Sequence, residues 1–253
     1  MTSTSSRSAP GRRPPELQGQ TVLIIGGSGG IGRATARRAR AEGADVILTA
    51  RDPARLEAAA TELGAVRSAA FDATDPPALL AFLAGLTEPV DHVLVTAGAP
   101  SYGALLELSA DAARAALSDH LLQAVLVAQG SAGRVRPGGT LVFLGGTGAK
   151  RPALGIGAVA AVTAAMPALV ANLALELAPV RVNLIAAGFV DTPLSARLLG
   201  DGLDARREEL RTTLPIGRVV GPDDVAALAV HLMANTALTG ATFDIDGGQQ
   251  LVA

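Results

Sequence analysis

Short apolar runs rich in β-branched residues alternate with longer, Ala- and Leu-rich stretches from residue 21 to the C-terminus. Runs of this length, apolar at nearly every position, are typical of strands buried on both faces, and the longer stretches are of helical length. The pattern predicts seven strands, at 21–27, 44–50, 66–71, 91–97, 140–145, 180–186 and 241–246. It predicts helices near 30–42, 53–63, 76–85, 109–130, 155–178 and 222–235.

This order of elements predicts an α/β fold with a single, seven-stranded parallel sheet, doubly wound in the Rossmann manner by right-handed crossovers. Gly43, Gly64 and Gly85 stand where three of the helices should end. Residues 191–215 interrupt the alternation of strands and helices with a charged segment, which we interpret as a helical flap over the site. Pro167 lies inside the helix predicted at 155–178 and predicts either a kink or a later helix start there.

Length and composition narrow the classes of function. A chain of 253 residues can form one large core, and we expect residues 17–253 to be one domain behind a flexible, polar tail at 1–16. The 21 basic and 23 acidic residues give a net charge of −2, which argues against a nucleic-acid partner. Cysteine is absent, so disulfides and thiolate metal sites are excluded, and we predict no metal centre. Without a signal-like segment or an unbroken apolar run of membrane length, we expect a cytoplasmic protein without a membrane partner.

The strongest candidate site is a glycine-rich turn between the first strand and the first helix. Gly26, Gly30 and Gly32 would let the backbone turn sharply and approach a pyrophosphate at the helix N-terminus, with Ser28 and Ile31 in the same turn. A turn of this kind also occurs as a plain connection between a strand and a helix. The alternating pattern around it favours dinucleotide binding.

The second predicted strand ends in Arg51 rather than in an acidic residue. An acidic side chain would accept a hydrogen bond from the ribose hydroxyl of NAD(H), whereas a guanidinium suits a 2′-phosphate. The sequence therefore favours NADP(H) over NAD(H). The alternative is that Arg51 is an ordinary solvated residue at the start of a helix.

Several separated segments resemble the short-chain dehydrogenase/reductase family. Residues 25–32 are similar to its TGxxxGIG motif with Ile in place of Thr, Phe71-Asp72 matches its adenine-contacting Asp, and 95–98 resembles its NNAG without the asparagines. Residues 181–194 resemble RVNxxxPGxxxTP, and two C-terminal segments also fit. The resemblance implies that Asp72, Ala97, Gly98 and Thr192 contact the cofactor, with Thr192 beside the nicotinamide carboxamide. It also implies a homodimer or homotetramer.

The catalytic residues of that family are missing. The family uses a Tyr-x-x-x-Lys pair, but this chain has one tyrosine, Tyr102, and one lysine, Lys150, at positions that cannot form it. By the family's spacing Gly145 replaces the catalytic serine, Ala158 the tyrosine and Val162 the lysine. None of these three side chains can ionise or donate a hydrogen bond, so the standard proton relay is excluded at those positions.

Three other side chains could supply a proton. Tyr102 and Lys150 follow the fourth and fifth predicted strands, and His120 stands where the family carries a structural asparagine. Each has a simpler alternative: Tyr102 as an apolar cover, Lys150 as a solvated cation and His120 as a helix-to-strand tie.

Three functions remain open. The first is an NADP(H)-dependent oxidoreductase with an atypical active site, acting on a small, mainly apolar carbonyl or alcohol substrate. The second is a non-redox enzyme of the same fold, such as a cyclase, dehydratase or isomerase. The third is a non-catalytic binding protein.

Overall fold

The computed structural model describes residues 16–252. Seven strands form one parallel sheet in the order β3-β2-β1-β4-β5-β6-β7, so the chain winds outward from β1 in one direction and from β4 in the other. The strands are β1 (Thr21–Ile25), β2 (Asp45–Ala50), β3 (Arg67–Ala70), β4 (Val90–Val95), β5 (Val135–Gly146), β6 (Arg181–Ala187) and β7 (Thr242–Ile245). The predicted doubly wound, single-domain α/β fold is confirmed.

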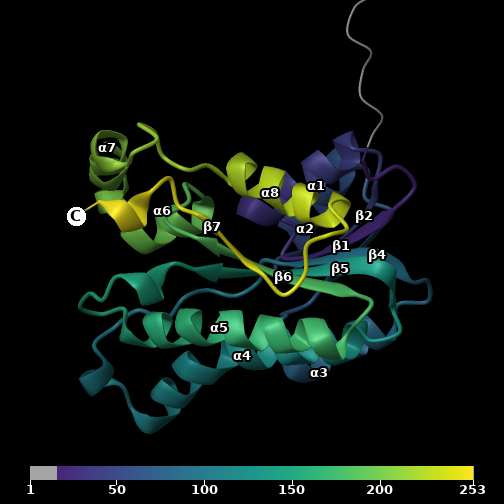
Figure 1. The fold of residues 1–253 in the computed structure, drawn as a ribbon, viewed down its shortest axis with the longest axis horizontal. Coiled ribbons are helices and arrows are strands. Elements are labelled where there is room, and N and C mark those ends of the chain that lie inside the picture. The colour runs from purple at the N-terminus through teal and green to yellow at the C-terminus, as the bar shows by residue number, and fades with distance from the viewer. Residues whose placement is uncertain (1–15, 253) are drawn as a thin grey trace, which may run out of the picture.

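Helices cover both faces of the sheet (Figure 1). One face carries α1 (Gly30–Ala41), α2 (Pro53–Leu63) and α8 (Pro222–Ala234), and the other carries α3 (Pro76–Ala84), α4 (Ala110–Ser131) and α5 (Gly157–Glu176). Each face has its own apolar core, one centred on Ile24, Leu48 and Val230, the other on Leu23, Phe143 and Met166. This two-sided burial is the reason that the strands are apolar at successive positions.

The predicted elements differ from the observed ones by a few residues at each end, with one larger exception. β5 begins at Val135, not at the predicted residue 140, and so includes Pro137, Gly138 and Gly139, a sequence that is typical of a turn. In the structure Val90 pairs with Val135 but His92 pairs with Thr140, so these residues form an irregularity inside one strand. The turn-forming sequence is therefore accommodated as an irregularity in the pairing of β4 with β5.

Glycine ends two of the helices in the predicted way. Gly64 caps α2 in the left-handed conformation at φ 59°, and Gly43 follows α1 at φ 87°. Gly85 caps α3 at φ −80°, so its flexibility is not needed for a left-handed turn there.

The α5 helix is apolar throughout and begins at Gly157, so the late start that Pro167 allowed is wrong. Proline is tolerated here inside a helix of 20 residues that packs on α4 and β6. By length and composition α5 could cross a membrane, with a mean hydropathy of 1.9, although core helices of globular domains meet the same test. Only 33% of its apolar window is buried, which leaves much of one face uncovered in the single chain.

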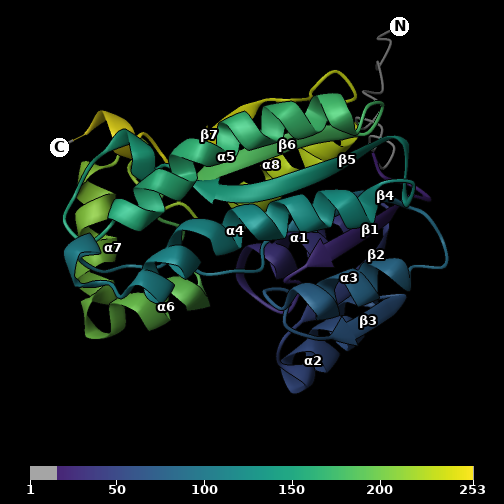
Figure 2. The same cartoon turned by 90° about the horizontal axis from the view of Figure 1, so that it is seen from below.

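The segment predicted as a helical flap forms α6 (Pro193–Leu199) and α7 (Leu203–Thr213). Both lie beyond one end of the sheet, at the left of Figure 1 and again in the view from below (Figure 2). The predicted flexible tail at 1–16 falls outside the described residues except for Glu16, so it stays a prediction.

Candidate active site

The candidate site lies at the carboxyl ends of β1 and β4, the two neighbouring strands from which the chain winds in opposite directions. Crevices at this position are where open α/β sheets bind ligands. The glycine turn follows β1, the 96–104 loop follows β4, and the loop leading into α6 follows β6. The fold therefore brings three predicted site segments to one edge of the sheet.

Tight contacts in the glycine turn leave no room for a side chain at Gly26 or Gly32. Gly26 has φ +104°, and a Cβ at Gly32 would lie 2.2 Å from the Gly26 carbonyl oxygen. Thr96 Oγ1 donates a hydrogen bond of 3.0 Å to that same oxygen, and the Gly26 amide donates to Thr49 O at 3.0 Å. Strands β2 and β4 thus hold the turn from both sides, and glycine is required at 26 and 32 for steric reasons.

The start of α1 fits a dinucleotide. Gly29 is the N-cap residue and provides no side chain to accept from the free amides of the first turn. Such amides, together with the helix dipole, form a ready site for phosphate. Because small residues keep the approach open, the turn that contains Ser28, Gly30 and Ile31 can hold a pyrophosphate against the backbone.

Arg51 and Asp72 lie together at the ends of β2 and β3, with Arg51 Nη1 3.7 Å from Asp72 Oδ2. The Asp72 Oδ1 atom accepts from the Thr74 amide at 2.9 Å and from its hydroxyl at 2.8 Å. Partial burial raises the pKa of Asp72, but the hydrogen bonds from Thr74 and the nearby Arg51 charge outweigh it and hold the pKa below its usual value. Asp72 is therefore an ionised hydrogen-bond acceptor beside an exposed guanidinium.

Two further predicted cofactor residues approach the turn, Ala97 from the loop after the neighbouring strand β4 and Thr192 from the loop after β6. A Cβ at Gly30 would lie 3.5 Å from the Thr192 side chain, so Thr192 faces the start of α1. Thr192 is also the N-cap of α6, and its Oγ1 accepts from the Ser195 amide at 3.3 Å. The Ala97 amide donates to Ile25 O at 3.0 Å, and this bond fixes the loop that continues into Gly98.

His120 reaches from α4 to the end of the sheet. Its Nε2 donates to Leu144 O of β5 at 3.0 Å, while Nδ1 would lie 3.5 Å from a Cβ at Gly98. Burial lowers the pKa of His120, and the hydrogen bond to Leu144 only partly opposes this. The imidazole is thus neutral at pH 7, a helix-to-strand tie that can accept a proton at Nδ1 but has none there to donate.

Neither of the other two proton-donor candidates forms a hydrogen bond with His120 within residues 16–252. Lys150 forms an ion pair with Asp244 of β7, which commits its ammonium to a structural contact. Tyr102 is 54% exposed and makes no hydrogen bond within residues 16–252, and partial burial raises the pKa of its phenol. Its loop is joined to the loop before α5 by the Gly103 amide, which donates to Gly155 O at 2.8 Å. Because burial raises the pKa of its phenol, Tyr102 stays protonated near neutral pH.

The positions that the family resemblance assigns to the relay are small or apolar. Gly145 lies in β5 opposite Ala186 of β6, and Ala158 and Val162 on α5 are 3% and 8% exposed. No group of three or more His, Asp or Glu side chains suited to a metal ion occurs in the described part of the chain. Ala158 and Val162 therefore form an apolar wall at these positions.

Two residues that help to form the site, Thr96 and Asp191, were not predicted from the sequence. In the sequence Thr96 was noted only as a position where the family motif has asparagine. In the structure its hydroxyl donates a hydrogen bond to the glycine turn. No role of its own was predicted for Asp191, yet Asp191 accepts from Arg207 Nε at 2.9 Å and from Nη2 at 2.8 Å, and these bonds hold α7 against the loop after β6. A pocket of about 400 Å³ is lined by Asp191 and Arg207, together with Thr192, Pro193 and Ala196. The position of Thr96 at the end of a predicted strand could have suggested a role in the site. Nothing in the sequence indicates that Arg207 is the partner of Asp191.

Comparison with known proteins agrees with this geometry. The family model described as enoyl-(acyl carrier protein) reductase matches residues 26–250. The short-chain dehydrogenase/reductase ATR9 of Stachybotrys chlorohalonatus is 29% identical, over 92% of this chain and 98% of that protein. The structure of the MalC reductase/Diels-Alderase from Malbranchea aurantiaca has a TM-score of 0.86 at 27% identity, covering 95% of this chain and all of that one. A small-chain dehydrogenase in complex with NADPH has a TM-score of 0.77 at 26% identity, covering 92% and 99%.

Proposed function

Since the chain belongs to the short-chain dehydrogenase/reductase family, we propose that it is an NADP(H)-binding oxidoreductase with an atypical active site. Its substrate is a small, mainly apolar carbonyl compound or alcohol. The proposal depends above all on one observation, the closed glycine turn with the exposed Arg51 guanidinium at the end of the neighbouring strand. When bound, the cofactor supplies or accepts a hydride.

The chain's own residues hold the cofactor and orient the substrate. The amides of the turn bind the pyrophosphate, Asp72 accepts from the adenine, and Thr192 contacts the nicotinamide end. His120 is the candidate proton acceptor because its neutral Nδ1 faces the space beside Gly98. Tyr102 is the candidate donor from the rim, and Lys150 is the weakest candidate because its ammonium is paired with Asp244. Most of the rate enhancement comes from holding the substrate close to the cofactor in the reacting orientation.

Cofactor titration tests the proposal. We expect isothermal titration calorimetry to give a micromolar Kd for NADPH and a much weaker one for NADH, with the preference lost in Arg51→Ala. Equal, weak binding of both dinucleotides by the wild type contradicts the proposal. A carbonyl and alcohol panel, followed by the absorbance of reduced nicotinamide, then tests turnover. His120→Ala and Tyr102→Phe should each lower turnover by about tenfold if that residue moves a proton.

A second candidate function is non-redox catalysis, such as cyclisation, dehydration or isomerisation. It is favoured by the apolar wall at Ala158 and Val162 and by the likeness to a protein whose title names it a reductase/Diels-Alderase. Product formation without consumption of reduced cofactor would establish it. Binding of cofactor and ligand without any product would instead indicate a non-catalytic binding protein.

We also propose a cytoplasmic homodimer or homotetramer that uses the uncovered face of α5. Ala161, Ala164 and Ala168 are exposed there and would allow a second helix to approach closely.

A further inference from the structure

Three arginines follow the glycine turn or the neighbouring strand β2, and they differ in their partners. Arg33, in the first turn of α1, is paired with Glu62 of α2. Arg51 lies 3.7 Å from the Asp72 carboxylate. The guanidinium of Arg55 makes no hydrogen bond or ion pair with any residue in the described range. Arg55 is thus the one cation of this group whose charge is left without a carboxylate.

Arg55 nevertheless has a defined place. A Cβ built at Gly29 would lie 3.0 Å from Arg55 Nη2, and no other atom comes within 4 Å of it. The Arg55 side chain therefore reaches back from α2 to the turn and occupies the space that a side chain at 29 would take. The base of the side chain is fixed as well, because the Arg55 amide donates to Asp52 Oδ1 at 3.0 Å in the α2 cap.

Arg55 and Arg51 project from the same short segment, the end of β2 and the first turn of α2. Both side chains are exposed, so neither is prevented from contacting a ligand at this edge of the sheet. A phosphate monoester carries nearly two negative charges at pH 7 and three acceptor oxygens, which one guanidinium cannot satisfy alone. A ribose hydroxyl needs neither cation.

We propose that Arg55 is a second specificity-determining residue, whose guanidinium binds the 2′-phosphate of NADP(H) jointly with Arg51, in the space that Gly29 leaves open. The inference rests on the proposed function, because it assigns a further residue to the same cofactor site. It also gives a reason for the glycine at 29, where φ is −170° and any residue could be accommodated by the backbone.

The test compares NADPH and NADH affinities by titration calorimetry in wild type, Arg55→Ala, Arg55→Lys and a control, Arg38→Ala. Arg38 is exposed on α1 two turns beyond the glycine turn, so its removal changes the net charge equally. We expect Arg55→Ala to weaken NADPH binding about tenfold while NADH changes less than twofold. Arg55→Lys should retain part of the preference, and Arg38→Ala should retain all of it.

Adenosine 2′,5′-bisphosphate and 5′-AMP provide a second readout that needs no turnover. Arg55→Ala should weaken the bisphosphate and leave 5′-AMP unchanged. Equal weakening of both probes, or of both dinucleotides, would mean that Arg55 supports the turn rather than the phosphate, and this overturns the inference.

The outcomes separate the two proposals. A wild type that prefers NADPH, and loses that preference in Arg51→Ala but not in Arg55→Ala, keeps the proposed function and refutes the role of Arg55. A wild type that binds neither dinucleotide refutes both.

Discussion

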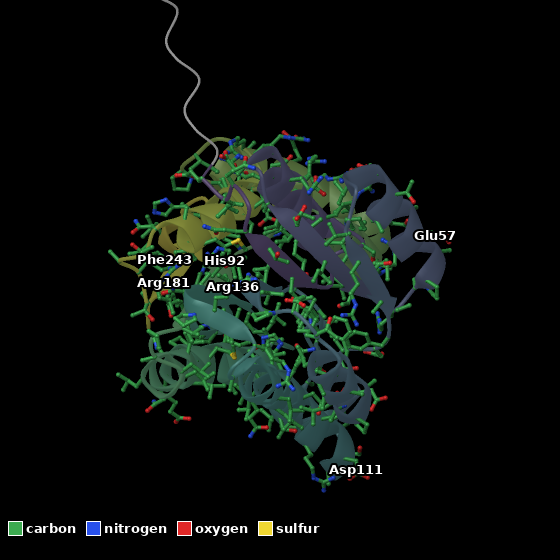
Figure 3. All side chains as sticks on the ribbon, turned by 90° about the vertical axis from the view of Figure 1, so that its right-hand side faces the viewer. Glu57, His92, Asp111, Arg136, Arg181 and Phe243 are labelled. Carbon is green, nitrogen blue, oxygen red and sulfur yellow. The ribbon has the colours of Figure 1, made fainter. Side chains whose placement is uncertain are left out.

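His92 should make the stability of this protein depend on pH, in a pH range above the one in which carboxylates usually titrate. The residue lies in β4 and is 3% exposed. Its Nε2 donates to Gln20 Oε1 at 2.6 Å, and its Nδ1 is buried without a hydrogen-bond partner among the described residues. Figure 3 shows His92 at the end where the strands begin, near Arg136 and Arg181. A charged imidazole there would bury an N–H that nothing accepts.

Burial is the main cause that lowers the pKa of His92, from 6.5 to about 4. The Asp91 carboxylate opposes the shift, and the Arg181 guanidinium reinforces it. Between these two values the unfolded chain binds a proton that the folded chain does not, so stability falls as the pH falls from 6.5 towards 4. The full shift corresponds to about 3 kcal/mol, of which about 2 kcal/mol is already lost at pH 5.

Urea unfolding followed by far-ultraviolet circular dichroism, at half-unit steps from pH 7.5 to 4.5, measures this loss. We expect the unfolding free energy of wild type to fall by about 2 kcal/mol more than that of His92→Gln between pH 7 and 5. Carboxylates and His120 titrate in both proteins, so their contributions cancel in the difference. The control His231→Gln removes an exposed histidine of α8 and should follow the wild type. Parallel curves for wild type and His92→Gln would refute the reasoning.

Three further predictions concern the turn, the flap and the uncovered helix face. Gly32→Ala places a Cβ 2.2 Å from the Gly26 carbonyl and should abolish dinucleotide binding in calorimetry, whereas Gly202→Ala, with open space around it, should not. Arg207→Ala removes the bidentate bond to Asp191 and should speed limited proteolysis within α6 and α7 several-fold, while Arg206→Ala, paired only within α7, leaves the rate unchanged. Leu175→Arg, at a site 80% exposed on α5, should shift light-scattering mass towards the monomer, and an unchanged mass would place the interface elsewhere.

The sequence by itself determined the order of elements, the parallel sheet and the position of the glycine turn. Each is encoded locally: runs of apolar residues specify buried strands, and a strand followed by a helix must return to pair in parallel. The absence of a Tyr-x-x-x-Lys pair needs no structure either, since one tyrosine and one lysine cannot form it.

Only the tertiary structure decided which distant side chains meet. Thr96 bonds the turn 70 residues away, and Arg55 reaches Gly29 from the next helix. Asp191 pairs with Arg207, and Lys150 pairs with Asp244, 94 residues further along the chain. Local patterns cannot rank such pairs, because contact distances and burial depend on how the helices pack against the sheet, and that packing sets the charge state and the reach of each side chain.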